Sequence, residues 1–311
     1  MYKDHRIATV VPAHNEALHI GQVIRTTPAF VDHIIVVDDC SADNTSEAAT
    51  QVGDPRVIVL RPPHNLGVGG ATVMGYRKGS ELGADITVKM DGDGQMSPDY
   101  LPMLLEALIE ENYDYAKGNR FLAGESLEHM PKVRLFGNVV LTFMTKLASG
   151  YWHVFDPQNG YTAIRARALA LIDLDRVHRR FFFENDMLTQ LNYHRLRVKD
   201  VAIPARYGDE ISDLEPLKIG LTFPWLLLRR FFRRVYQKYV LRDFSPIALF
   251  LFTGLLLFFW GLLFGLYLWV RTKLTGEPTP TGTIMLALLP LILGFQLLLQ
   301  ALVLDIQETP K

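Results

Sequence analysis

The sequence predicts an α/β fold built on a mainly parallel central sheet, followed by amphipathic helices and a two-helix transmembrane hairpin. As far as residue 112, short apolar runs typical of buried strands alternate with amphipathic helical patterns. Such alternation is typical of right-handed crossovers between parallel strands. Near the C-terminus, residues 246–270 and 284–304 contain no charged side chain, and each stretch is long enough to span a bilayer.

Four predicted strands come in order, each followed by a helix. The strands cover residues 7–11, 34–37, 57–60 and 86–90, and the helices begin near Glu16, Ala42, Gly67 and Pro98. Ligands of parallel sheets bind at the carboxyl ends of the strands. Polar residues follow all four strands, at positions 12–16, 38–43, 64–70 and 91–95. We therefore expect the four loops to form one crevice.

The loop after the fourth strand carries Asp91, Asp93 and Gln95, with a glycine between each pair. The first glycine lets the chain turn so that both carboxylates can reach one cation, and Gln95 adds a neutral oxygen. This oxygen-only set is too small to close a coordination sphere, which favours Mg2+ or Mn2+ shared with the phosphates of a substrate. The alternative is an acidic turn in which Ser97 or Asp99 caps the next helix.

The glycines Gly67, Gly69 and Gly70 invite comparison with a dinucleotide-binding motif. They follow the third strand, however, lack the full motif spacing and have no acidic partner for a ribose where one is expected. We expect them to permit close packing of a helix on the sheet. The single cysteine, Cys40, excludes an intramolecular disulfide and a cysteine-based structural zinc site.

Charge is distributed unevenly along the 311 residues, although the net charge is only -1. The loop between the two uncharged stretches holds Arg271 and Lys273 against Glu277, whereas the cations before the first stretch are Arg229, Arg230, Arg233, Arg234, Lys238 and Arg242. By the positive-inside rule, the N-terminal domain and the C-terminus then lie in the cytoplasm. Buried core helices are the alternative for both stretches.

Residues 224–242 form an amphipathic pattern directly before the first uncharged stretch. Its apolar members recur at helical spacing and are Leu228, Phe231, Phe232, Val235 and Tyr239. The cations placed largely on the opposite side are Arg230, Arg233, Arg234 and Lys238. We expect a helix that lies in the anionic headgroup layer rather than the solvated face of a soluble helix.

Two sets of motifs resemble those of known glycosyltransferases. Three motifs of this chain resemble, in order and spacing, the nucleotide-sugar-binding signature of family 2 glycosyltransferases, which have the GT-A fold. They are Pro12-Ala13-His14-Asn15-Glu16, Asp38-Asp39-Cys40-Ser41 and Asp91-Gly92-Asp93-Gly94-Gln95. The later motifs of the polyprenyl-phosphate branch resemble Gly118-Asn119-Arg120-Phe121, Asp156-Pro157-Gln158-Asn159-Gly160-Tyr161 and Phe183-Glu184-Asn185-Asp186. The resemblance implies a GT-A catalytic domain over residues 1–212, interface helices over 213–245 and a hairpin over 246–311.

The resemblance also implies a donor site. Asp91, Asp93 and Gln95 would hold Mg2+ or Mn2+ on the diphosphate of a UDP- or GDP-sugar, and Asp39 would contact the nucleoside. The remaining donor-binding residues would be Pro12, Ala13, His14, Asn15, Glu16, Val37, Asp91 and Gly92. His14 stands where relatives usually carry tyrosine.

On the acceptor side, the resemblance assigns phosphate contacts to Arg120, Arg134 and Arg206. Structural salt bridges are the alternative for each arginine. Asp156 could orient the acceptor, orient an arginine or start a turn before proline. The catalytic residues are thus expected to be Asp93, Arg120, Arg134 and Asp156.

The function implied by the resemblance is transfer of a sugar, with inversion, to a polyprenyl phosphate of the undecaprenyl or dolichyl type. We expect an integral protein of a prokaryotic plasma membrane rather than of the endoplasmic reticulum, no nucleic-acid partner, and a hairpin that could mediate homo-oligomerisation. The alternatives are a transferase to another membrane glycan acceptor and a non-catalytic nucleotide-binding scaffold. A processive polysaccharide synthase is disfavoured because the chain lacks a Q-x-x-R-W motif and further membrane helices.

Overall fold

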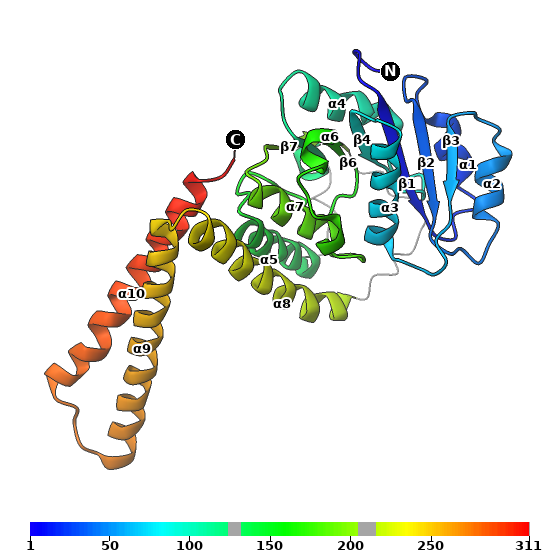
Figure 1. Cartoon of the computed structure of the whole chain (residues 1–311). Coiled ribbons are helices and arrows are strands. Elements are labelled where there is room, and N and C mark those ends of the chain that lie inside the picture. Colours follow the sequence, from blue (N-terminus) through cyan, green and yellow to red (C-terminus); the bar gives the residue numbers. More distant parts are fainter. Residues whose placement is uncertain (124–131, 205–215, 311) are drawn as a thin grey trace. The chain divides into compact units, whose positions relative to one another are not determined.

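The computed structural model describes residues 1–123, 132–204 and 216–310. The chain divides into two compact units, the first formed chiefly by Met1–Arg230 and the second by Phe231–Thr309. The first unit is an α/β domain, and the second contains a helical hairpin (Figure 1). The predicted fold class is confirmed in both units.

A seven-stranded sheet in the order β3-β2-β1-β4-β6-β5-β7 forms the centre of the first unit. Strands β1, β2 and β3 pair in parallel, as do β1 with β4 and β5 with β7, whereas β6 is antiparallel to both of its neighbours. The sheet is therefore mainly parallel, as predicted. The strands are β1 (Ile7–Ala13), β2 (His33–Asp38), β3 (Val57–Leu60), β4 (Ile86–Lys89), β5 (Tyr115–Asn119), β6 (Thr162–Arg165) and β7 (Val198–Ala202).

Helices cover both faces of this sheet and bury its apolar side chains. Apolar residues of α1, α2 and α4 join the core on one face, and those of α3 and α7 join the core on the other. Burial on both faces explains why β1 and β2 are almost continuously apolar instead of alternating. The helices are α1 (Ile20–Thr26), α2 (Thr45–Gln51), α3 (Val68–Glu81), α4 (Leu101–Ile109), α5 (Lys132–Ser149), α6 (Ala166–Leu169) and α7 (Phe183–Tyr193), with short 3-10 turns at Pro98–Tyr100, Phe121–Ala123 and Leu174–Arg176.

Two of the predicted helices begin later than the sequence pattern indicates. Helix α1 begins at Ile20 rather than near Glu16, and α2 begins at Thr45 rather than near Ala42. Before α1, the backbone amides of residues 15–17 donate to side chains of residues 41–45. Before α2, the amides of Ser41 and Ala42 donate to the side chains of Asp38 and Asn15. The sequence pattern detects the amphipathic turns but not these competing acceptors.

The glycine expectation is wrong for Gly69 and Gly70. A Cβ on Gly69 would lie 2.4 Å from the carbonyl oxygen of His178, and one on Gly70 would lie 2.6 Å from the Leu66 Cβ, so neither glycine faces the sheet. The close approach of α3 to the sheet is made by Gly75, where a Cβ would lie 2.2 Å from Val10 Cγ1. The first turn of α3 packs against residues 178–183, a contact that the spacing of the glycines in the sequence does not reveal.

The expected basic face of the segment 224–242 is also wrong for three of its cations. The segment lies in α8 (Pro216–Val235) and a following π-helical turn (Tyr236–Leu241). In the first unit, Arg230 donates to the buried carboxylate of Asp186 at 2.6 Å. In the second unit, Arg234 and Lys238 are buried, and Arg234 binds Asp305 through hydrogen bonds of 2.7 and 2.9 Å. Acidic partners distant in sequence turn Arg230 and Arg234 inward.

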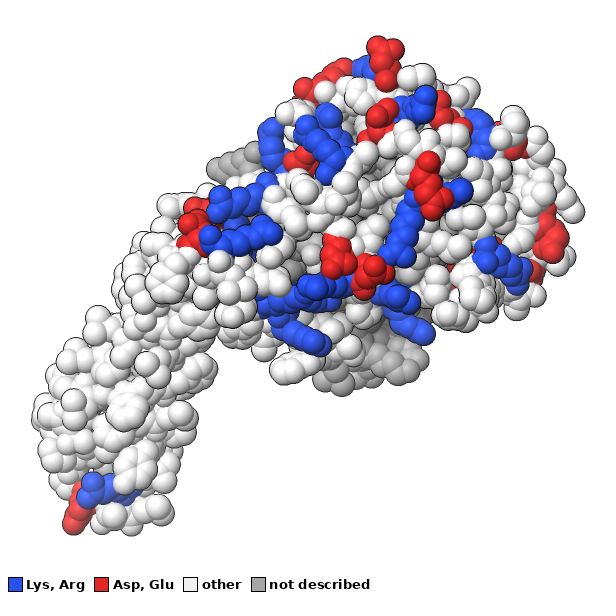
Figure 2. Space-filling view, in the orientation of Figure 1, with Lys and Arg blue, Asp and Glu red and all other residues white. Residues whose placement is uncertain are grey.

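The hairpin of the second unit consists of α9 (Pro246–Thr275) and α10 (Thr281–Gln307). Both helices are long and apolar enough to cross a membrane. A Cβ on Gly261 would lie 2.6 Å from the Ala287 carbonyl, and one on Gly294 would lie 2.4 Å from the Phe258 nitrogen, so these glycines let the helices approach closely. On the face shown in Figure 2, the surface between the hairpin's ends is almost free of charge.

Candidate active site

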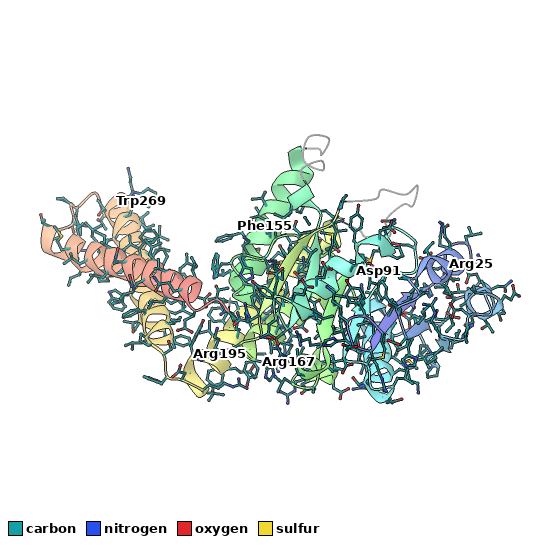
Figure 3. All side chains as sticks on the ribbon, turned by 90° about the horizontal axis from the view of Figure 1, so that it is seen from above. Arg25, Asp91, Phe155, Arg167, Arg195 and Trp269 are labelled. Carbon is teal, nitrogen blue, oxygen red and sulfur yellow. The ribbon has the colours of Figure 1, made fainter. Side chains whose placement is uncertain are left out.

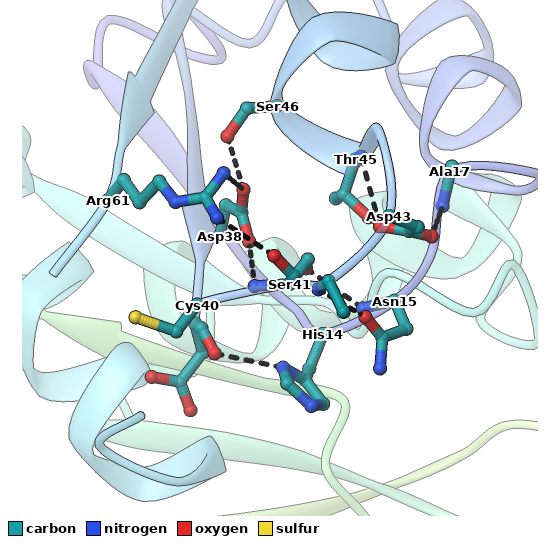
Figure 4. Close-up of polar contacts among 12 residues, drawn as sticks. His14, Asn15, Ala17, Asp38, Cys40, Ser41, Asp43, Thr45, Ser46 and Arg61 are labelled. Atoms are coloured by element: carbon teal, nitrogen blue, oxygen red, sulfur yellow. Dashed lines mark hydrogen bonds and ion pairs between the residues drawn. The ribbon is translucent and has the colours of Figure 1, made fainter. Parts of the chain in front are cut away.

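The loops after β1 and β2 are joined by hydrogen bonds between their residues (Figure 4). The Asn15 amide donates to Ser41 Oγ at 2.9 Å, and the Ala42 amide donates back to Asn15 Oδ1 at 2.8 Å. The Glu16 amide donates to Thr45 Oγ1 at 2.9 Å. Asn15 has a φ of 62°, a left-handed conformation that asparagine adopts more readily than most residues. The structure thus brings Asn15 and Glu16 of the predicted donor site into one fixed double loop.

Asp39 connects this double loop to the start of α3. Its buried carboxylate accepts hydrogen bonds from the amides of Leu66 at 2.6 Å and Gly67 at 2.8 Å. Its carbonyl oxygen lies 2.9 Å from Nδ1 of the exposed His14, which orients that ring. The contact of Asp39 with a nucleoside stays a prediction, since both carboxylate oxygens already bind backbone amides.

Neighbouring Asp38 was not among the predicted site residues, yet it organises the same loop. Its carboxylate is fully buried and accepts from the Ser41 amide at 2.8 Å and from Arg61 at 3.1 Å. Burial alone would raise the pKa of Asp38, but the hydrogen bonds from Ser41 and Ser46 and the charge of Arg61 lower it. Asp38 therefore stays ionised and fixes the turn that carries Asp39.

Three other predicted donor residues are buried in the ends of the strands. Pro12 and Ala13 end β1, and Val37 lies opposite Pro12 in β2. The carbonyl of Pro12 accepts from the Gly92 amide at 3.2 Å, and that of Ala13 accepts from the Asp39 amide at 2.8 Å. The structure places these residues at the base of the loops, where their backbones connect the carboxyl ends of β1, β2 and β4.

The acidic loop after β4 lies against the end of β1, as the sheet order requires. A Cβ on Gly92 would lie 3.1 Å from the Ala13 Cβ, so a glycine is suited to this close approach. Gly94 has a φ of 76°, and the Gln95 amide donates to Asp93 Oδ1 at 2.9 Å. These features bring Asp91 and Asp93 to the carboxyl end of the sheet, beside the predicted donor loops.

Sequence reasoning missed a buried cation beneath the acidic loop. Lys89, the last residue of β4, is 1% exposed, and its Nζ lies 2.7 Å from Asp91 Oδ1 and 3.1 Å from Glu184 Oε1. Burial alone would lower the pKa of Lys89, but the two carboxylates more than offset this effect and raise it. Burial raises the pKa of Glu184, opposed by Lys89. The sequence signal that could have indicated this buried cation is a lysine within an apolar strand pattern.

A divalent cation fits the donor chemistry of the acidic loop. Asp91, Asp93 and Gln95 supply only oxygen atoms from their side chains, the ligand type that Mg2+ and Mn2+ prefer. Within residues 1–123, 132–204 and 216–310, no group of three His, Cys, Asp or Glu side chains is arranged to hold a metal. A cation at Asp91 and Asp93 would therefore need oxygen ligands from a substrate or from water.

Arg120 and Asp156 form the second polar centre of the site. Arg120 follows β5, and its Nε and Nη2 atoms each lie 2.7 Å from one oxygen of the Asp156 carboxylate. Burial would raise the pKa of Asp156, but its hydrogen bonds and ion pair with Arg120 lower it. A small cavity beside the pair is lined by Arg120, Phe121, Leu141, Thr142, Asp156, Pro157 and Gln158. The structure shows two of the three predicted contacts of Asp156: its carboxylate binds Arg120, and its carbonyl accepts from the Asn159 amide at 3.0 Å in a turn. Its role toward the acceptor stays a prediction.

The segment 156–160 connects the two polar centres. Asp156 at its start binds Arg120, and the Gly160 carbonyl near its end lies 3.4 Å from Lys89 Nζ. A Cβ on Gly160 would lie 2.7 Å from Asp91 Oδ2. The acidic loop and the arginine centre therefore border the same short stretch of chain.

The other two predicted arginines cannot be placed in the same way. Arg134 belongs to the first turn of α5, and its side chain lies outside the described part of the structure. Arg206 falls within 205–215, outside the described residues. Their phosphate contacts stay predictions.

Comparison with known proteins relates this geometry to a family. Residues 9–172 match the family model described as "Glycosyl transferase family 2". A UDP-N-acetylglucosamine–dolichyl-phosphate N-acetylglucosaminyltransferase of Methanococcus voltae is 32% identical over 66% of this chain and 88% of its own length. An undecaprenyl-phosphate mannosyltransferase of Micrococcus luteus is 33% identical over 64% of this chain and 82% of its own.

A solved structure shares the fold of the first unit. Glucosyl-3-phosphoglycerate synthase from Mycobacterium tuberculosis, crystallised with Mn2+, UDP and glucosyl-3-phosphoglycerate, matches with a TM-score of 0.55 and 22% identity. The match covers 74% of this chain and 80% of the synthase. The α/β unit therefore has the GT-A fold, and, since the matched motifs and the family model cover the same strand ends, the chain belongs to glycosyl transferase family 2.

Proposed function

We propose that this protein transfers a sugar, with inversion, from a nucleotide-diphosphate sugar to a polyprenyl phosphate. The observation that carries the proposal is the pairing of an acidic loop at Asp91 and Asp93 with an arginine centre at Arg120, both bordering segment 156–160. The relatives named above act on dolichyl and undecaprenyl phosphates. The apolar hairpin supports a lipid acceptor, because it would keep the α/β unit at a membrane.

On the donor side, the residues of the chain have to bind and orient a diphosphate. Asp91 and Asp93 would hold Mg2+ or Mn2+, which when bound supplies neutralisation of the leaving diphosphate. The Lys89 ammonium fixes one Asp91 oxygen from beneath, so the carboxylate is oriented before substrate arrives. The double loop carrying His14, Asn15 and Glu16 would surround the nucleoside.

On the acceptor side, the chain does not need a strong general base. A phosphate monoester has a second pKa of about 6, so it is mostly a dianion at neutral pH. Arg120 binds Asp156 through Nε and Nη2, so a phosphate would bind N–H groups of the planar guanidinium that do not contact Asp156. The lowered pKa of Asp156 makes it a weak base, which favours an orienting role. Arg134 and Arg206 would add further cations.

The proposed setting is a prokaryotic plasma membrane, crossed by α9 and α10, with the α/β unit and both termini in the cytoplasm. The flanking cations support this orientation through the positive-inside rule. Residues 1–212 would then be the catalytic domain, 213–245 the interface region and 246–311 the membrane hairpin.

The test is an assay of the purified full-length protein with a panel of UDP- and GDP-sugars and either undecaprenyl or dolichyl phosphate. Radiolabelled sugar is expected to pass into the chloroform–methanol phase with at least one donor. Transfer to water-soluble acceptors alone would contradict the lipid acceptor. Nucleotide-diphosphate binding without any transfer across the panel would favour a non-catalytic scaffold.

A further inference from the structure

A second lysine is buried beside the arginine centre, and the proposed chemistry does not use it. Lys117 in β5 is 1% exposed. Its Nζ donates to the carbonyl oxygens of Gly118 at 3.0 Å, Phe155 at 3.0 Å and Asp156 at 2.6 Å. A buried ammonium is unfavourable unless its donors are satisfied, and here three carbonyls satisfy them. Two of these carbonyls belong to the turn that carries Asp156.

Asp200 in β7 binds the same turn through the backbone amide of Phe155, whereas Lys117 binds the Phe155 carbonyl. Its Oδ2 accepts from the Phe155 amide and from Asn119 Nδ2, each at 2.7 Å, and its Oδ1 lies 3.7 Å from Lys117 Nζ. Both backbone polar groups of Phe155 are therefore bound by side chains of the sheet. Phe155 itself lies beside α5 (Figure 3), with Lys146 Nζ 3.5 Å from its ring centre.

The turn that these side chains hold has a left-handed backbone. Asp156 has a φ of 49°, in the region that residues other than glycine, asparagine and aspartate seldom adopt. Such conformations persist where the surrounding structure over-determines them. From this conformation Asp156 directs its carboxylate at Arg120, with the two 2.7 Å contacts already described.

We infer that Lys117 is a positioning residue, which fixes the Asp156 turn so that Asp156 aims the Arg120 guanidinium at the phosphate of the acceptor. The inference rests on the proposed function in one respect, the contact of Arg120 with that phosphate. Lys117 binds groups of strand β5, strand β7 and the turn at 155–156, and it binds none of the predicted donor residues. Its loss should therefore act on one substrate only.

The primary experiment compares Lys117→Met with the unmodified protein in steady-state assays in which donor and lipid phosphate are varied separately. Methionine keeps the length of the side chain and removes the ammonium. We expect kcat/KM for the lipid phosphate to fall roughly 10- to 100-fold, the cost of misplacing a binding group by about 1 Å. The affinity for the nucleotide diphosphate, measured by calorimetry, should stay within about twofold of the unmodified protein.

The matched control is Lys199→Met. Lys199 lies in the adjoining strand β7 and binds Glu111 at the surface. Removing its ammonium leaves the turn untouched and should change neither kcat/KM for the lipid phosphate nor the affinity for the nucleotide diphosphate. If both lysine variants impair the lipid-phosphate kinetics equally, the effect is not specific to the turn and the inference is overturned.

Lys117→Met leaves the buried carboxylate of Asp200 without the ammonium of Lys117 beside it, and this variant could fail to fold. The double variant Lys117→Met/Asp200→Asn removes that charge while keeping an oxygen for the Phe155 amide. We expect it to recover the melting temperature and to retain the lipid-phosphate defect. Recovery of both properties would show that Lys117 serves the fold alone.

A double-mutant cycle with Asp156→Asn tests the route of the effect. If Lys117 acts through Asp156, the double variant should be no worse than Asp156→Asn alone, whereas additive losses would exclude that route. Arg120→Lys separates this inference from the proposed function. If Arg120→Lys leaves the lipid-phosphate kinetics unchanged, Arg120 does not contact the acceptor phosphate, and both the proposed contact and this inference fail. If Arg120→Lys impairs these kinetics but Lys117→Met does not, only this inference is overturned.

Discussion

The ammonium of Lys89 lies 2.7 Å from one oxygen of Asp91, beneath the loop that carries both predicted metal ligands. Asp91 thus offers a ligand mainly through its second oxygen, and its rotamer is fixed by a residue of the strand below. The arrangement makes the donor side dependent on a buried charge balance among Lys89, Asp91 and Glu184.

Asp93→Asn should lower the transfer rate by about 100-fold or more, because the remaining carboxylate would hold a cation weakly. Chelation by EDTA should have the same effect on the unmodified protein, reversed by Mn2+. Calorimetry of nucleotide-diphosphate binding with and without Mn2+ provides a readout apart from activity. Full activity of Asp93→Asn in the presence of chelator would refute the assignment.

Lys89→Met should lower the melting temperature, with a loss of about 3 kcal/mol or more, because Asp91 and Glu184 would face each other without their shared cation. Adding Glu184→Gln should restore much of this stability. The control is Lys78→Met, since the Lys78–Glu81 pair is exposed and such pairs contribute about 1 kcal/mol at most. Equal destabilisation by both lysine variants would show that Lys89 has no special role.

The transfer rate should rise with pH through the second pKa of the acceptor phosphate, about 6, and then level off. The pKa of Asp156 is lowered in the folded protein, so its carboxylate is already ionised throughout this range. Any stability that it contributes is present above its unfolded pKa and is lost only as pH falls toward its lower folded pKa. Asp156→Asn should therefore reduce the rate without moving the acidic limb.

The same pH series shows whether Asp156 acts as a base instead. If the acidic limb disappears in Asp156→Asn while nucleotide affinity is preserved, then Asp156 is the base and the acceptor does not react as a pre-formed dianion.

Arg234→Gln should destabilise the hairpin unit by about 3 kcal/mol, because Asp305 and Tyr239 share the buried site that Arg234 neutralises. The companion variant Arg234→Gln/Asp305→Asn should recover part of the loss. Arg229→Gln, at an exposed position, serves as the control and should leave the melting temperature unchanged. Thermal unfolding in one detergent provides the comparison, and an unaltered midpoint for Arg234→Gln would argue against the buried pair.

The sequence alone determined the elements whose signals are local. Continuous apolar runs marked the first four strands, and uncharged stretches marked α9 and α10, because burial and membrane insertion both depend on side-chain polarity over a short window. The order of polar loops then placed Asp39, Asp91 and Asp93 at one edge of a sheet, since parallel strands align their carboxyl ends. These features required no knowledge of distant contacts.

Only the tertiary structure decided which charges meet. Arg120 and Asp156 are 36 positions apart, and Arg234 and Asp305 are 71 apart. Helical spacing therefore placed Arg234 on a basic face, whereas the fold buries it against an acid from another helix. Lys89 is a single charge at the end of an apolar strand pattern, and its carboxylate partners are Asp91 in the following loop and Glu184 in α7. Periodicity reports whether a side chain is buried, but the partner that makes burial of a charge tolerable depends on three-dimensional packing.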